Sequence, residues 1–137
     1  MISPLTGAFR FHGPDELCEV LEAAWDGVLT DLRWHTEVGD GDTRALFFHA
    51  EARGEPVEEA QLLRFDEYGL IREMTLFGRP LPGLTAVMTG IAGPLLGRQK
   101  RALAGRLLAA ATAPLAMLTK VGERRIVPLA DPAKARR

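Results

Sequence analysis

Glu59 and Gln61 stand two residues apart in a segment that continues with Leu62 and Leu63. In an extended strand, residues at this spacing point to the same face, whereas Glu58 points to the other. A carboxylate buried on such a face would have a raised pKa and could act as a general base. The amide of Gln61 could hydrogen-bond a ligand. The alternatives are an exposed Glu59 and a structural amide with its own partner.

The chain has three histidines, His12, His35 and His49. His35 is predicted to share a strand face with Glu37, and His49 to share one with Glu51. Either pair could act as acid and base if its face lines a cavity. The opposite faces of these strands are apolar, which favours an arrangement with the histidines in solvent.

Neither a metal nor a nucleotide cofactor is indicated. The spacing of the histidines matches no metal-ligand motif, so we expect no metal site. The sequence Gly39-Asp40-Gly41-Asp42 is typical of a tight hairpin turn, and not of a phosphate-binding loop. We therefore expect no cofactor.

Turn residues and period-2 alternation predict an antiparallel meander of four strands over residues 31–38, 43–53, 57–65 and 70–78. The turns fall at residues 39–42, 53–56 and 66–69. A short strand is predicted at Phe9-Arg10-Phe11. A helix is predicted to begin at Gly13-Pro14-Asp15-Glu16, since proline and acidic residues suit a first turn. Its apolar stripe is Leu17, Val20, Leu21, Ala24, Trp25 and Val28.

After Pro80 the pattern becomes helical. Gly90, Gly93, Pro94 and Gly97 are expected to weaken or break the first of these helices. A second helix is predicted over residues 99–119, and Pro114 should kink or end it. The sequence thus predicts one α+β domain, with a curved-sheet core at 1–80, packed helices at 81–120, and an extended, partly mobile tail at 121–137.

Composition places the chain among ordinary globular proteins, with 47% hydrophobic residues, 26% charged residues and a net charge of −1. No nucleic-acid partner is expected without a basic excess. A single cysteine, Cys18, fits a cytoplasmic location. The uncharged run 107–119 is shorter than the roughly 20 residues of a spanning helix, so membrane contact is not expected. A basic start at Arg98 to Arg106 leaves an interfacial or partner-binding helix as the alternative to a core helix.

Three features occur in an order that resembles the nuclear transport factor 2-like superfamily, which includes ketosteroid isomerases and SnoaL-like polyketide cyclases. They are the Ser3-Pro4 step, the Gly13-Pro14-Asp15-Glu16 helix start and the Arg64-Phe65…Gly69-Leu70-Ile71 hairpin. The resemblance implies a curved, cone-like sheet around an apolar pocket. Members usually begin with two helices and a strand that precede the equivalent of Ser3. We expect the C-terminal helices to occupy their space.

The resemblance also implies a site in the concavity of the sheet. The carboxylate positions of ketosteroid isomerases fall on Ser3 and Gln61, so activity of that kind is not expected. The implied function is binding of a small apolar molecule by a homodimer, with isomerase- or cyclase-type acid–base chemistry as an open question. The alternative is a non-catalytic dimerisation or interaction module. The catalytic candidates are Gln61, Glu59, His35 and His49, and the ligand-binding candidates are Trp34, Phe48, Leu63, Met74, Phe77 and Arg79.

Overall fold

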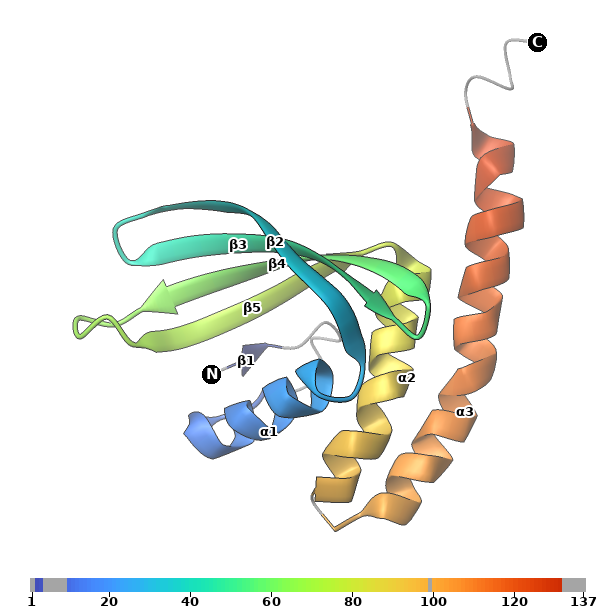
Figure 1. Cartoon of the computed structure of the whole chain (residues 1–137), viewed down its shortest axis with the longest axis horizontal. Coiled ribbons are helices and arrows are strands. Elements are labelled where there is room, and N and C mark those ends of the chain that lie inside the picture. Colours follow the sequence, from blue (N-terminus) through green and yellow to red (C-terminus); the bar gives the residue numbers. More distant parts are fainter. Residues whose placement is uncertain (1, 4–9, 99, 132–137) are drawn as a thin grey trace.

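A computed structural model describes residues 2–3, 10–98 and 100–131 of the chain. A curved, five-stranded sheet has the order β1-β5-β4-β3-β2, with β1 parallel to β5 and the other pairs antiparallel. One helix precedes the meander and two follow it (Figure 1). The predicted α+β class is confirmed. The strands are β1 (Ile2–Ser3), β2 (Leu29–Asp40), β3 (Thr43–Ala52), β4 (Glu55–Phe65) and β5 (Ile71–Arg79), and the helices are α1 (Gly13–Trp25), α2 (Leu81–Arg98) and α3 (Ala102–Val121).

The hairpins form where the turn residues predict them. Gly41 has a φ of 56° between β2 and β3, and Arg53 and Gly54 have φ of 53° and 77° between β3 and β4. Such left-handed conformations match the twist of paired strands. In the last turn, the carboxylate of Asp66 accepts hydrogen bonds from the backbone N–H groups of Tyr68 and Leu70, both at 2.9 Å. These local bonds fix the register of the sheet.

Helix α1 begins at the predicted place, with Pro14 in its first turn. The carboxylate of Glu16 accepts a hydrogen bond from the His12 backbone N–H at 2.7 Å, which satisfies a donor at the helix start. Trp25, which the helical spacing placed on the buried stripe, is 44% exposed. The predicted strand at residues 9–11 is not formed as such, because Phe11 makes only an isolated bridge and Phe9 lies outside the described residues.

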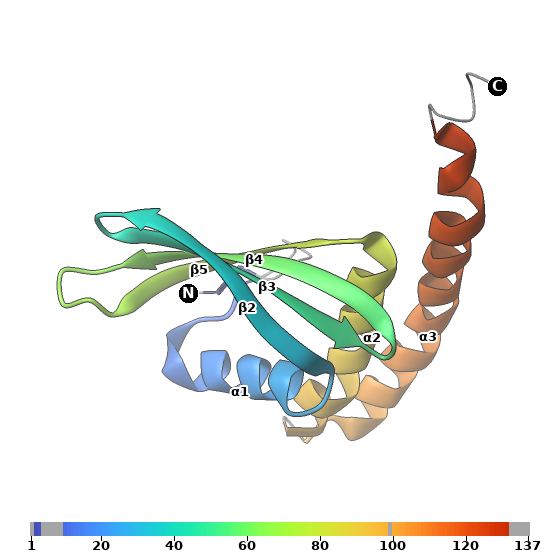
Figure 2. The same ribbon diagram turned by 45° about the horizontal axis from the view of Figure 1, so that its top comes forward.

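The core lies between one face of the sheet and helices α1 and α2, over which the sheet curves (Figure 2). We call this the covered face, and the opposite one the open face. The core has two clusters of buried apolar side chains. The first is Val28, Leu29, Phe48, Ala50, Ala52, Val57, Ala86 and Val87, and the second is Phe11, Leu63 and Met74, extended by Leu17, Val20 and Leu21 of α1 and by Leu95 of α2.

Helix α2 packs directly on the sheet and is continuous through Pro94, so the predicted break does not occur. Close packing explains this. A β carbon on Gly83 would lie 2.2 Å from the carbonyl oxygen of Pro56, and one on Gly27 would lie 3.3 Å from the ring of Pro94. The helix is thus held by tertiary contacts that offset the poor local propensity.

Helix α3 packs on α2 through a stripe of small residues. Gly105 is buried there, and the hydroxyls of Thr85 and Thr119 lie 2.8 Å apart. Pro114 does not end the helix. The chain continues as a π-helical turn at Gly122–Ile126 and a 3₁₀ turn at Val127–Ala130, so the prediction of an extended tail is wrong up to residue 130.

Of the C-terminal helices, α2 lies under the sheet, whereas α3 lies on the far side of α2 and rises past the end of the sheet (Figures 1 and 2). Besides its packing on α2, the C-terminal end of α3 contacts the sheet at Glu55 of β4. Glu55 is 7% exposed and forms ion pairs with Lys120 and Arg124. In length and composition the segment Ala102–Ala130 would suffice to cross a membrane, and it is largely unburied. Arg106 and Lys120 nevertheless confine its longest uncharged run to residues 107–119.

Candidate functional site

Glu59 and Gln61 point together into the core from the covered face of β4. They are 5% and 4% exposed, and the Nε2 of Gln61 donates a hydrogen bond to Oε1 of Glu59 at 3.1 Å. The spacing argument is confirmed, because both side chains share one face and Glu58 lies on the other. Of the alternatives left open by the sequence, Glu59 is buried and Gln61 has a protein partner.

The surroundings of the pair are apolar. On β4 it lies between Val57 of the first core cluster and Leu63 of the second. Phe48 is directly opposite Glu59 on β3, while Gly78 is opposite it on β5.

Burial raises the pKa of Glu59 from 4.5 to about 7, and the hydrogen bond from Gln61 opposes this rise in part. The cause is desolvation, which disfavours the charged form in an apolar environment. A carboxyl group with this pKa exchanges its proton near neutral pH. It therefore has the property required of a general acid or base.

The ligand-binding candidates are divided between the two faces. Phe48, Leu63 and Met74 are buried on the covered face. Trp34 meets Phe48 edge-on, with ring centroids 4.9 Å apart, and remains half exposed. Phe77 and Arg79 belong to the open face, because they pair in register with Ala60 and Glu58 of β4. These two side chains are therefore directed away from Glu59 and Gln61.

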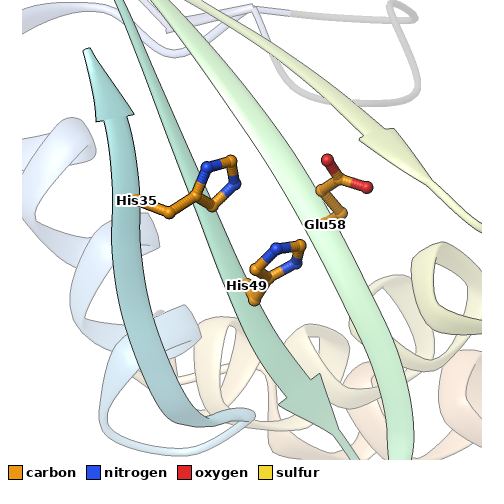
Figure 3. A group of neighbouring side chains, drawn as sticks. All are labelled: His35, His49 and Glu58. Carbon is orange, nitrogen blue, oxygen red and sulfur yellow. The ribbon is translucent and has the colours of Figure 1, made fainter.

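His35 and His49 are also on the open face, apart from the buried pair. Their rings stack, with centroids 4.4 Å apart and planes inclined by 22°. One side-chain donor atom from each lies within 4.8 Å of a carboxylate oxygen of Glu58, and the three residues come from three neighbouring strands (Figure 3). The structure thus places the histidines with Glu58 and not with Glu59.

A β-bulge in β2 brings His35 to this position. The register pairs Trp34 with Phe48 and then Thr36 with Phe47, so His35 is the extra residue. The same shift pairs Glu37 with Leu46 and moves it to the face opposite His35. The prediction that His35 and Glu37 share a face is therefore wrong. His49 and Glu51 do share a face, and both lie on the open side.

Two hollows lie near this histidine pair. One, of about 400 Å³, is lined by Asp31, Arg33, His49, Ala50, Glu51, Pro56, Val57, Glu58 and Pro80. The other, of about 370 Å³, is lined by Trp34, His35, Thr36, Glu37 and Leu46. Glu59 and Gln61 line neither of these hollows.

Arg79 forms an ion pair with Glu58, in which the Nε of Arg79 donates a hydrogen bond to Oε2 of Glu58 at 2.6 Å. Ser3 pairs in register with Thr75 of β5. The side chain of Ser3, at the expected base position, lies outside the described part of the chain.

Comparison with solved structures gives matches that include the following two. An uncharacterised bacterial protein with a cystatin-like fold from Silicibacter pomeroyi aligns with a TM-score of 0.63 and 23% identity, over 71% of this chain and 65% of the other. A steroid delta-isomerase from Pseudomonas aeruginosa aligns with a TM-score of 0.60 and 23% identity, over 72% of this chain and 69% of the other. The chain has the fold of the nuclear transport factor 2-like superfamily.

This chain spans just under two thirds of the length of the Silicibacter pomeroyi protein. At such identities the likeness concerns the fold alone. No family model and no curated protein matches the sequence.

Proposed function

We propose that this nuclear transport factor 2-like domain binds a small, mostly apolar molecule between the covered face of its sheet and helices α1 and α2. Apolar walls with a few convergent polar groups are typical of small-molecule sites. The observation that carries the proposal is Glu59, a carboxylate 5% exposed, with a pKa of about 7 and an amide partner. A structural role alone does not require an ionisable group at this position.

In the proposed reaction, Glu59 removes a proton from a carbon next to a carbonyl group of the ligand. Near neutral pH a substantial fraction of Glu59 is unprotonated and can accept it. Gln61 donates an N–H to Glu59 in the free protein and holds its carboxylate in place. The protonated Glu59 then returns the proton to another carbon in an isomerisation, or to the new hydroxyl oxygen in a cyclisation.

A thermal-shift screen against steroids, aromatic polyketides, terpenes and fatty acids tests the binding step. A ligand at a hundredfold excess over its Kd stabilises the folded chain by about 2.7 kcal/mol. We expect one class to raise the Tm with concentration. Gln61→Leu and Glu59→Gln should reduce this rise, while Glu58→Gln, which changes the adjacent residue on the open face, should retain it. The absence of a shift with every class would contradict the proposal.

A second candidate is self-association without catalysis, and the exposure of α3 favours it. Leu103, Leu107 and Leu118 are 71%, 63% and 69% exposed. The buried and half-buried positions of this helix are mostly small residues, such as Gly105 and Thr119, and its large apolar side chains face outward. Apolar surface of this kind commonly marks an interface. The two candidates are compatible, since α3 lies apart from Glu59.

A further inference from the structure

We propose that His35, His49 and Glu58 form a binding site for a divalent transition-metal ion such as Zn²⁺ on the open face of the sheet. Two imidazoles and a carboxylate are a recognised ligand set for zinc, in which a fourth position stays open to water or substrate. The three donor atoms lie within 4.8 Å of one another. This site is independent of the function proposed for Glu59, which lies on the covered face.

Metal binding requires only a small movement of the three side chains. Bonds of about 2.0–2.2 Å around a tetrahedral ion place neighbouring donor atoms roughly 3.4 Å apart. The donors, which lie within 4.8 Å of one another, must therefore approach one another by at most about 1.4 Å. His35 and His49 are exposed and Glu58 is only partly buried, so rotation of these side chains can close the gap without repacking the core.

The histidine pair is already arranged side by side. The stacked rings come from adjacent strands, and the bulge at His35 brings the two imidazoles together. The Nδ1 of His35 lies 2.8 Å from the hydroxyl oxygen of Thr36. The tautomer that donates its Nδ1–H to Thr36 leaves the Nε2 lone pair for a metal. A hydrogen bond of this kind orients a ligating histidine.

The carboxylate of Glu58 has a similar support. Both contacts with Arg79, from Nε and from Nη2, go to Oε2 of Glu58. Arg79 therefore restrains the carboxylate while Oε1 takes no part in this ion pair. The positive charge of Arg79 lowers the affinity of the site for any cation. The two imidazoles favour a transition metal over Ca²⁺ or Mg²⁺, which prefer oxygen ligands. His49 and Glu58 border the hollow of about 400 Å³, which gives solvent access to this side of the cluster.

The test is titration of the metal-free full chain with Zn²⁺ at pH 7.5, by calorimetry and by competition with a chromophoric chelator. We expect one equivalent to bind. His35→Ala, His49→Ala and Glu58→Gln should each weaken binding at least tenfold, and His12→Ala, which changes the histidine outside the cluster, should leave it unchanged. Thr36→Val keeps the shape of the side chain, and its effect should be 10–100-fold, the usual range for a supporting hydrogen bond.

Three further readouts make the test decisive. Circular dichroism of each variant checks that the fold is intact. Co²⁺ should give visible absorption bands of a low-coordinate site with the wild-type chain, and not with the His35→Ala/His49→Ala double variant. Zinc affinity should fall at acid pH, because a protonated imidazole has no lone pair for the metal. No binding by the wild type, or equal binding by the double variant, would overturn the proposal.

Discussion

At the scale of the residue, Glu59 connects the stability of the fold with its proposed chemistry. Its pKa is about 7 in the folded protein and 4.5 when unperturbed. Between these values the folded chain keeps a proton that the unfolded chain has lost. The folded state binds more protons there, so the contribution of Glu59 to stability falls as the pH rises through this window and is constant above it.

Glu59→Gln should therefore stabilise the protein at alkaline pH. One pKa unit corresponds to about 1.4 kcal/mol, so the rise in pKa from 4.5 to about 7 predicts that the variant gains about 3 kcal/mol relative to the wild type between pH 4 and pH 8. Urea denaturation of both proteins across this range measures the difference. A gain of the same size in Glu58→Gln, or a difference independent of pH in Glu59→Gln, would show that burial of Glu59 is not the cause.

The sequence predicted the site in part. The shared face of Glu59 and Gln61 follows from the period of a strand, and this is a local property. The burial of that face depends on α1 and α2, which are distant along the chain. The meeting of His35, His49 and Glu58 depends on the bulge in β2, for which no residue near His35 gave a signal. Their spacing in sequence therefore showed no metal-ligand motif.

At the scale of the element, the contact of α3 with α2 rests on a close approach at Gly105. A β carbon there would lie 2.9 Å from the carbonyl oxygen of Ala92 and 3.3 Å from Cα of Gly93. The helices would have to separate, because both atoms belong to the backbone. Alanine would otherwise favour the helix over glycine by about 1 kcal/mol.

Gly105→Ala should lower the free energy of unfolding by up to about 2 kcal/mol, since overpacking costs about 1–3 kcal/mol and the gain in helix propensity offsets about 1 kcal/mol of this cost. Gly122→Ala is the matched control, because its β carbon would meet nothing within 4 Å and its φ of −58° is helical. That control should be neutral or slightly stabilising. Thermal unfolding of both variants makes the comparison, and equal effects would refute the close-packing argument.

The buried carboxylate of Glu55 joins the end of α3 to the sheet. Its side chain is 10% exposed, while those of Lys120 and Arg124 are 43% and 62% exposed. Solvent screens the two cations, so the pairs are worth less than fully buried ones.

Glu55→Gln should destabilise the chain by about 1 kcal/mol and should speed amide hydrogen exchange in residues 117–126 more than elsewhere. Glu37→Gln removes an exposed pair with Arg44, at 3.6 Å, and serves as the control. If both variants leave exchange in α3 unchanged, Glu55 does not anchor this helix.

The elements themselves were predictable where their signals are local. The hairpins follow from turn residues such as Gly41 and Gly54, and the start of α1 from Pro14. The break expected at Pro94 does not occur, and the packing of Pro94 against Gly27 shows why, since tertiary contacts outweigh propensity. Helix α3 does not end at Pro114. The helical course of residues 122–130 was missed, as its glycine, proline and charges are typical of a loop.

At the scale of the whole molecule, the outward leucines of α3 give a prediction about assembly. A chain that associates through this helix should sediment as a dimer at micromolar concentration. Combined replacement of Leu107 and Leu118 by lysine should convert it to a monomer, because charges are costly in an apolar interface. Arg106→Lys keeps the charge on the same helix and should remain dimeric. A wild-type chain that is monomeric at every concentration would exclude this mode of association.

The irregular course of β2 has one more consequence. This strand is at the edge of the sheet, where unpaired N–H and C=O groups could accept a strand from another molecule. Its register shifts twice, between Thr30 and Arg33 and between Trp34 and Thr36, and Asp31 has a φ of 53°. A strand so bent cannot offer a long, flat row of donors and acceptors. The distortion that creates the histidine pair therefore also protects the protein against edge-to-edge aggregation.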